Sequence, residues 1–240
     1  MSYQYPDGRR FNYGMHAFSV TWKSKHFLLM PFIWFYPKNF NAPGFQANAD
    51  FAFSNWSVST QVYAWFPIYS ATLAKTYYRG DLIGRDTASL LVRQRFDIKN
   101  YHVGWLVYKN FGNANAQLGW NGSPVPFDTT DDTPYEDAYT NLYNANSITI
   151  AGIVGGKIKQ FSWQLLGKLI YSPRADSQSL GLTLEYHLTK RINFMVRLNG
   201  YQVVMHRGYK VGYFHAGYNP KFAPTTQDRS YLMTSMSYDL

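Results

Sequence analysis

The stretch "SLLVRQRFDI", residues 89–98, decides the fold because it sets two arginines in a strongly apolar segment. Successive side chains of a β-strand point to opposite faces, so Arg93 and Arg95 point the same way. Ser89 and Asp97 share their face, and the opposite face is apolar, with Leu90, Val92, Phe96 and Ile98. The segment is therefore predicted to be a strand with one polar and one apolar face.

The same alternation of polar and apolar residues continues along most of the chain, and no long amphipathic helix is expected. In residues 43–54, for example, Phe45, Phe51 and Phe53 oppose Gln46 and Asp50. The pattern predicts eleven strands, at about 10–22, 26–37, 43–54, 56–68, 86–98, 100–109, 147–157, 160–172, 177–188, 191–204 and 229–240.

The lengths of the strands and of their connections favour a membrane barrel. The predicted strands have about 10 to 13 residues, near the 9 to 11 of a tilted transmembrane strand and longer than the usual five or six. Tight turns are predicted at Lys23–Lys25, Ser54–Asn55, Lys99, Lys159 and Lys190–Arg191, and long loops at 69–85, 110–146 and 205–228. Short turns on one side and long loops on the other are typical of an outer-membrane barrel.

The composition supports this prediction. The chain of 240 residues is 19% aromatic but only 15% charged, whereas about a quarter of the residues in a soluble domain are charged. The longest apolar run, Phe27 to Tyr36, has ten residues, too few for a membrane helix of about 20. A soluble sandwich, with both arginines on a solvated face, is the alternative.

In a membrane barrel the apolar face meets lipid and the polar face lines a water-filled lumen. The residues expected to line the lumen with charged or titratable groups are Arg93, Arg95, Lys168, Arg197, His102, Glu185 and His187. Neutral polar residues would complete a wettable wall, namely Ser57, Ser59, Gln61, Ser89, Gln164, Thr183 and Asn199.

The loop at 110–146 holds the densest charge cluster, which consists of Asp128, Asp131, Asp132, Glu136 and Asp137. These carboxylates have three possible roles. The loop could fold into the pore as a constriction, remain a solvated extracellular loop bridged by ions to lipopolysaccharide, or bind calcium. Its spacing does not match the EF-hand pattern.

No motif for catalysis or cofactor binding stands out. Cysteine is absent and the six histidines show no metal-ligand spacing. The Gly-Gly-Lys at 155–157 lacks the rest of a phosphate loop. The net charge of +9 is dispersed over turns and strands rather than clustered, which argues against nucleic-acid binding. No enzyme activity, cofactor, metal or nucleic-acid partner is predicted.

At family level the chain resembles the C-terminal part of an OprD-type porin, and most of all the Hof-type outer-membrane proteins of Helicobacter. The resemblance rests on the basic, Tyr-rich strands, on the loop "NGSPVPFDTTDDTPYEDAYTNLY" at 121–143 and on the ending "GYNPKFAPTTQDRSYLMTSMSYDL" at 217–240. Such porins are monomeric eighteen-stranded barrels that admit small solutes past a ladder of basic residues. The resemblance implies that Arg93, Arg95, Lys168 and Arg197 form such a ladder here.

The C-terminal strand and the number of strands lead to two further predictions. The ending resembles the terminal strand by which the barrel assembly machinery recognises its clients, although Leu240 stands where Phe is usual. Eleven strands is an odd number, and bacterial barrels normally have an even one. Residues 1–240 are thus expected to form a single, N-terminally truncated barrel domain, about 11 strands of roughly 18. A complete twelve-stranded barrel is the alternative.

The sequence thus predicts an all-β protein, an antiparallel transmembrane β-barrel in the outer membrane of a Gram-negative bacterium. Its expected function is that of a porin for small hydrophilic solutes, in contact with outer-membrane lipid and lipopolysaccharide. The alternative function is that of a surface adhesin or structural barrel with no transport role.

Overall fold

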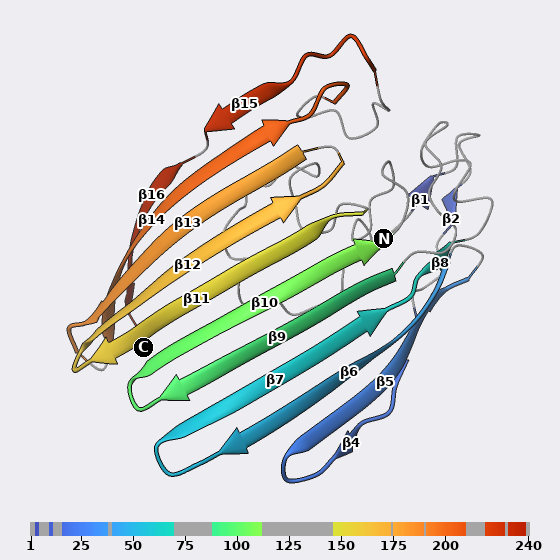
Figure 1. Ribbon diagram of the computed structural model, residues 1–240. Coiled ribbons are helices and arrows are strands. Elements are labelled where there is room, and N and C mark those ends of the chain that lie inside the picture. The colour runs from blue at the N-terminus through green and yellow to red at the C-terminus, as the bar shows by residue number, and fades with distance from the viewer. Residues whose placement is uncertain are drawn as a thin grey trace.

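The computed structural model is built from antiparallel strands (Figure 1). It describes residues 3–4, 10–11, 16–37, 40–69, 88–111, 146–173, 175–189, 191–209, 219–228 and 230–238. Within these residues no helix is long and apolar enough to cross a membrane. The constriction candidates Asp128, Asp131, Asp132, Glu136 and Asp137 lie outside them.

The main sheet is a meander in which almost every strand pairs with the strands before and after it in the chain. Its members are β3 (His16–Ser19), β4 (Trp22–Lys23), β5 (Phe27–Tyr36), β6 (Phe40–Ala52), β7 (Trp56–Trp65), β8 (Ile68–Tyr69), β9 (Ala88–Ile98), β10 (Tyr101–Phe111), β11 (Ile148–Ile158), β12 (Phe161–Tyr171), β13 (Ala175–His187), β14 (Ile192–Met205), β15 (Thr225–Asp228) and β16 (Tyr231–Tyr238). A separate pair is formed by β1 (Tyr3–Gln4) and β2 (Arg10–Phe11).

Ten of the eleven predicted strands are confirmed, and most of their ends move by only a few residues. Of the predicted strand 10–22, only β3 and β4 join the main sheet, while Arg10–Phe11 pairs with Tyr3–Gln4. The tight turns also form where they were expected. Lys99 and Lys159 each adopt φ 54° in two-residue turns that join β9 to β10 and β11 to β12. These turns set the pairing register of the strands that they connect.

The first predicted strand, 10–22, is broken in the structure because its partner β5 contains a proline. Val20 lies between β3 and β4, and its amide donates to the Pro31 carbonyl over 3.1 Å. Pro31 has no amide hydrogen and cannot donate a bond in return. The sheet therefore loses one ladder bond at this point, and β3 ends at Ser19.

The last predicted strand begins earlier than expected and is also interrupted. Residues 225–228 form β15 instead of loop, and β15 and β16 both pair with β14. Between them, the Ser230 amide donates to Asp228 Oδ1 over 2.8 Å, and the Tyr201 amide donates to Ser230 Oγ over 3.1 Å. These side chains compete with the backbone ladder, as Asp and Ser often do.

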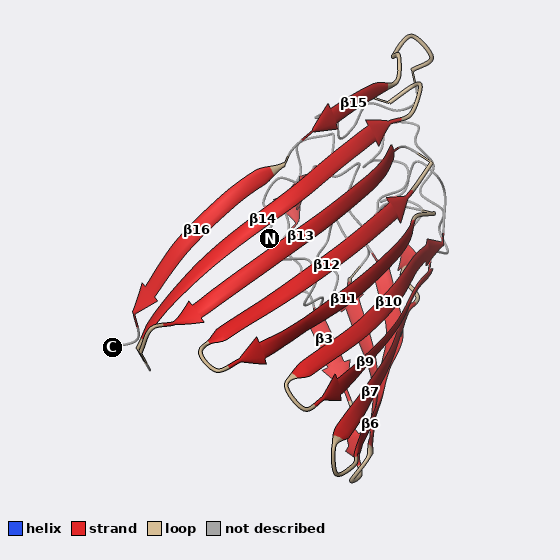
Figure 2. Ribbon diagram, turned by 60° about the vertical axis from the view of Figure 1, so that its left-hand side comes forward, coloured by secondary structure: helices blue, strands red, loops and turns tan. Residues whose placement is uncertain are grey.

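The sheet curves strongly about the strand direction, so that β3 lies behind β9 to β11 in Figure 2. Among the described strands, β3 and β4 form one edge and β15 and β16 the other. The short turns lie together at one end of the sheet (Figure 1). We call this the short-turn end, and we call the opposite end the long-loop end.

Candidate functional site

The strand register assigns every side chain of the sheet to one of two faces. The polar face is the one that carries Arg93 and Arg95 of β9. All seven charged or titratable residues predicted to line a lumen share this face, as the pairings across β9 to β14 show: Arg93, Arg95, His102, Lys168, Glu185, His187 and Arg197. The seven neutral residues of the expected wettable wall share it as well.

Two rows of directly paired residues cross the polar face. One row runs from Arg93 through Leu106 and Ala151 to Lys168. The other row runs from His102 through Gly155, Gln164 and Thr183 to Arg197. Since neighbouring strands lie about 4.8 Å apart, Arg93 and Lys168 are about 14 Å apart at their backbones. The basic residues thus form a spaced array rather than one cluster.

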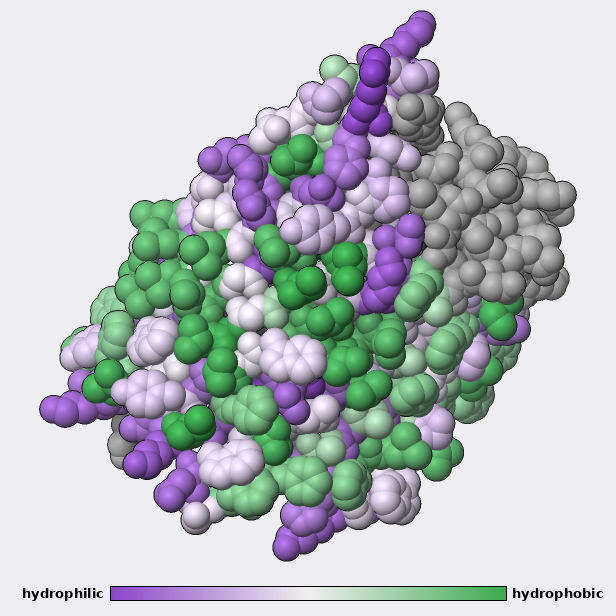
Figure 3. Space-filling model, in the orientation of Figure 1, coloured by the Kyte–Doolittle hydropathy of each residue, from purple (hydrophilic) through white to green (hydrophobic). Residues whose placement is uncertain are grey.

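The opposite, apolar face is the exposed outer surface of the curved sheet. In Figure 3 hydrophobic residues spread across the middle of this face, with hydrophilic residues toward its ends. Leu180, Leu198 and Leu232 are 59%, 46% and 64% exposed there. Large apolar side chains of this kind are unfavourable in water and are typical of a surface that meets lipid.

Aromatic residues mark the two borders of the apolar face in three pairs, and the members of each pair are ten residues apart along one strand or just beyond its end. These exposed pairs are Trp56 and Phe66, Tyr101 and Phe111, and Phe161 and Tyr171. Ten residues span about 34 Å along a strand. At the usual tilt of about 40° this corresponds to a thickness of about 26 Å, close to the apolar band of about 25 Å in outer-membrane barrels.

A hollow opens on the polar face above Gly104 of β10. Its lining includes both arginines and, on the far side, Ile153, Gln164 and Leu166. Its empty volume is ≈ 510 Å³, open solvent included. Even an alanine at position 104 would crowd this hollow, because a Cβ there would lie 2.9 Å from the Gln94 carbonyl oxygen and 3.1 Å from Ile153 Cγ2, and both residues line it. The glycine therefore keeps open the space beside the two arginines.

Arg95 forms an ion pair within its own strand, two residues from Asp97. Its Nε and Nη2 donate to Asp97 Oδ1 over 3.0 and 2.8 Å. The two side chains are 42% and 41% exposed, so water screens the pair and it adds at most about 1 kcal/mol to stability. The pair orients the guanidinium and offsets part of its charge.

His102 lies over a glycine on the neighbouring strand. A Cβ at Gly155 would lie 2.6 Å from His102 Cε1 and 2.6 Å from the Trp163 carbonyl oxygen. His102 Nε2 is buried without a hydrogen-bond partner. Closer to the short-turn end, Glu185 Oε2 accepts a 3.3 Å hydrogen bond from Ser162 Oγ.

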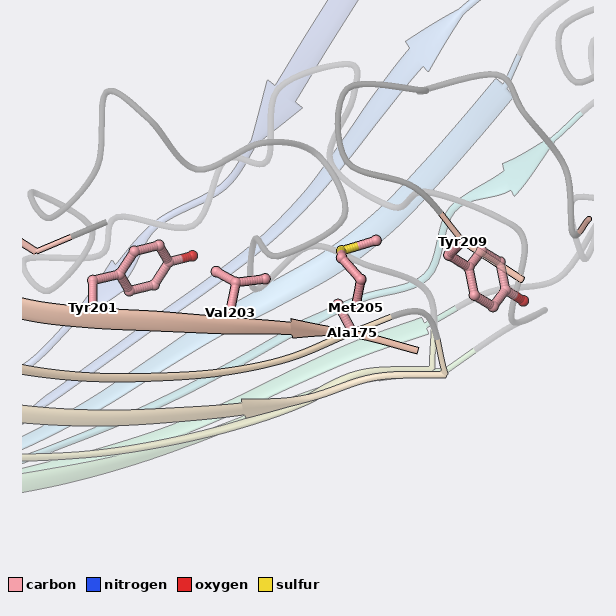
Figure 4. Packing of buried hydrophobic residues seen from close by; sticks show 5 residues of the cluster. All are labelled: Ala175, Tyr201, Val203, Met205 and Tyr209. Carbon is pink, nitrogen blue, oxygen red and sulfur yellow. The ribbon is translucent and has the colours of Figure 1, made fainter. Parts of the chain in front are cut away.

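Toward the long-loop end the polar face is buried. Lys168 is only 2% exposed, and Ser89 and Ser177 are 1% and 6% exposed. Figure 4 shows Tyr201, Val203 and Met205 pointing to the same side of β14, in one buried cluster with Ala175 and Tyr209. The open part of the polar face therefore lies in the middle of the sheet and toward the short-turn end.

The base of the segment between β10 and β11 is tied together by hydrogen bonds. The Asn110 amide donates to the Ser147 carbonyl oxygen over 2.9 Å. Lys109 Nζ donates to the carbonyl oxygen and Oδ1 of Asn146 over 3.2 and 3.0 Å. The loop predicted at 110–146 therefore begins and ends at one fixed point on the sheet.

The strand pattern did not reveal three polar pairs. Gln94 shares the apolar face and donates to Thr60 Oγ1 over 3.2 Å. Near the long-loop end of the same face, Gln178 Nε2 donates to Gln202 Oε1 over 2.8 Å. The third is the pair of Arg95 with Asp97. The positions of both partners on one face were visible in the sequence, but their contacts depend on strand register and rotamers.

The sequence predicted no metal site. Within the described parts of the chain, no group of three His, Cys, Asp or Glu residues is placed to hold a metal ion. The acidic loop lies outside these parts, so calcium binding stays one of its three possible roles and is untested.

Comparisons with known structures identify the type of fold. Acinetobacter baumannii OccAB2 matches with a TM-score of 0.63 at 12% identity, over 92% of this chain and 55% of its own. OccAB4 of the same organism matches with 0.61 at 9% identity, over 98% and 56%. Pseudomonas aeruginosa OccK8 (OprE) matches with 0.61 at 9% identity, over 92% and 58%. The chain thus spans less than two thirds of these proteins.

Comparisons of sequence identify the family. No curated protein sequence matches this chain. A family described as "Putative outer membrane protein" matches residues 1–240. The OprD-type barrel architecture expected from the sequence is confirmed by the shared fold. The chain therefore belongs to this family of outer-membrane proteins and is located in the outer membrane of a Gram-negative bacterium.

Proposed function

We propose that this chain forms the wall of an outer-membrane channel through which small hydrophilic solutes diffuse. The observation that carries the proposal is the separation of the two faces. One face holds the charged and polar residues, and the other is an apolar band bordered by aromatic residues. The OprD- and Occ-type porins that share its fold support the same role.

The polar face has an excess of positive charge, which would favour solutes with anionic groups. Its described strands carry six basic and three acidic residues, so that three positive charges are in excess. They are Lys23, Arg93, Arg95, Lys157, Lys168 and Arg197 against Asp50, Asp97 and Glu185. Rings of basic side chains select anions in other pores. Arg93 and Arg95 flank the hollow above Gly104, where a passing carboxylate or phosphate group could approach them.

Planar-bilayer recording of the full-length protein tests this proposal. We expect stepwise openings and, in a salt gradient, a reversal potential that indicates anion preference. Replacing Arg93 and Arg95 together with alanine should reduce the preference, most clearly at 0.01 M salt, where the Debye length is about 30 Å. Lys109→Ala removes a cation from the apolar face and should leave selectivity unchanged. A silent barrel would refute the transport role.

One observation favours a second candidate, a closed barrel whose loops bind a partner. The polar face is buried toward the long-loop end, where Tyr63, Leu91, Tyr108 and Ile170 are at most 2% exposed. If this packing closes the lumen, the protein would insert into the bilayer without conducting. The same recordings distinguish the two candidates.

Further parts of the proposal concern relatives and partners. A relationship to the Hof-type outer-membrane proteins is proposed, and no enzymatic role is proposed. The acidic loop is proposed as either a constriction or a solvated surface in contact with lipopolysaccharide. Recognition by the barrel assembly machinery would use β16, whose apolar-face residues Leu232, Met236 and Tyr238 are 64%, 67% and 54% exposed.

A further inference from the structure

The short-turn end of the sheet carries a rim of exposed cations. Lys25, Lys99, Lys159 and Arg191 lie in four of the hairpin turns. All four side chains are exposed. The turn sequences at 24–26, 53–55, 99–100, 159–160 and 188–191 contain no acidic residue. We call these four residues the basic rim.

Acidic residues near the same end are set back from the turn tips. Asp97 lies on the polar face and is held by Arg95 at 2.8 Å. Glu185 also lies on the polar face and accepts a hydrogen bond from Ser162. These carboxylates point toward the interior of the curved sheet, so they do not neutralise the turns. The rim is therefore a positive surface of its own.

Two rim lysines occupy a backbone conformation that lysine disfavours. Lys99 and Lys159 both have φ 54°, in the left-handed region that glycine and asparagine adopt more readily. The sequence keeps a cation at both turn tips despite this preference. A lysine kept in a strained backbone conformation suggests that its positive charge has a role at that turn.

Aromatic residues lie immediately inside the rim on the apolar face. Trp56, Tyr101 and Tyr186 are 41%, 51% and 43% exposed, and the Tyr186 hydroxyl donates to Gln160 Oε1 of the adjacent turn over 3.2 Å. Aromatic belts of this kind lie at the level of the lipid headgroups. Lysine side chains just beyond such a belt extend to the phosphate groups.

From the rim charge, its turn conformation and the adjoining aromatic belt, we propose that the basic rim binds the phosphate groups of anionic phospholipids. The occupant is a phosphatidylglycerol-type headgroup in the leaflet next to the short turns. This inference goes beyond channel function and depends only on the outer-membrane location of the protein. Each headgroup phosphate would lie between a turn cation and the aromatic belt above it.

Quenching of tryptophan fluorescence by brominated lipid tests the proposal on the full-length protein. The protein is reconstituted in phosphatidylcholine vesicles with increasing brominated phosphatidylglycerol. Of its seven tryptophans, Trp22, Trp56 and Trp163 lie on the apolar face near the short turns and report from that end. We expect an association constant about fivefold higher for phosphatidylglycerol than for phosphatidylcholine, since one basic residue attracts anionic lipid by about 1 kcal/mol. The preference should disappear in 1 M salt, where the Debye length is about 3 Å.

A triple variant locates the effect. Lys99→Gln, Lys159→Gln and Arg191→Gln together remove three of the four rim cations, including Lys99 beside Trp56, and should lower the preference toward one. The matched control replaces three cations away from the rim, Lys109→Gln, Arg207→Gln and Lys221→Gln, and should keep the fivefold ratio. A preference that survives in the triple variant, or that the control loses equally, overturns the proposal, and so does a wild-type ratio of one.

Conductance of the same preparations separates this inference from the proposed function. A protein that prefers phosphatidylglycerol but never conducts would refute the channel and leave the lipid site intact. A protein that conducts but has no lipid preference would refute the lipid site and leave the channel intact.

Discussion

Replacing Val92 with arginine would place a charge near the centre of the apolar face. On the neighbouring strand, Tyr101 and Phe111 mark the borders of that face, and they pair with Ile98 and Ala88 of β9. The midpoint of β9 between these borders is position 93, so Val92 lies one residue from it. One residue is about 3.4 Å along the strand, or about 2.6 Å in depth at a tilt of about 40°.

At this depth an arginine costs about 2–4 kcal/mol, which lowers the folding equilibrium constant by about 30- to 1,000-fold. Urea unfolding of the full-length protein in phosphatidylcholine vesicles, followed by tryptophan fluorescence, measures the change. Val92→Leu controls for packing, and Gln164→Arg puts the same charge on the polar face. Both controls should stay within about 0.5 kcal/mol of the wild type.

The outcome that would refute the assignment of the faces is a reversal of these effects. If Val92→Arg folds normally while the Arg93→Ala and Arg95→Ala double variant fails to assemble, then the apolar face does not meet lipid. The soluble sandwich would then become the better interpretation of the alternating pattern.

Three further substitutions test local features in the same unfolding assay. Gly155→Ala should destabilise the protein by about 1–3 kcal/mol, because the new methyl group would lie 2.6 Å from the Trp163 carbonyl oxygen. Gly152→Ala is the control, since the nearest atom to its new methyl group would be 4.0 Å away. Lys99→Asn should stabilise by about 1 kcal/mol, since asparagine tolerates φ 54° better than lysine; a loss of stability would show that the turn is not strained. Gln94→Leu should stabilise modestly, because the 3.2 Å bond to Thr60 is worth only about 0.6 kcal/mol in a membrane; a loss above 1 kcal/mol would contradict this.

Much of the sheet could be predicted because side-chain alternation depends only on local sequence. The assignment of Arg93, Lys168 and Arg197 to one face needs only strand parity, and the observed register confirms it. The break near Val20 could have been predicted only by knowing that Val20 pairs with Pro31 of the next strand. That pairing is not visible in the sequence of either strand alone. The early start of β15 was missed for a related reason, since Thr225 and Thr226 look like loop residues without their partners on β14.

The candidate site was less predictable than the fold. Alternation indicates which side chains share a face but not how exposed they are. Lys168 and Arg95 looked equivalent in the sequence, yet Lys168 is 2% exposed and the Arg95 side chain is 42% exposed and paired with Asp97. Burial at the long-loop end depends on packing between distant segments, and such packing has no periodic signal in the sequence.

The two-residue turns at Lys99 and Lys159 have a consequence for how this protein can change during evolution. Inserting or deleting one residue within a strand reverses the facing of every side chain beyond that point until the next turn. Such a change would move leucines to the polar face and arginines to the apolar face at a single step. Length variation among homologues should therefore occur in pairs of residues within strands, and freely only in the connections at the long-loop end.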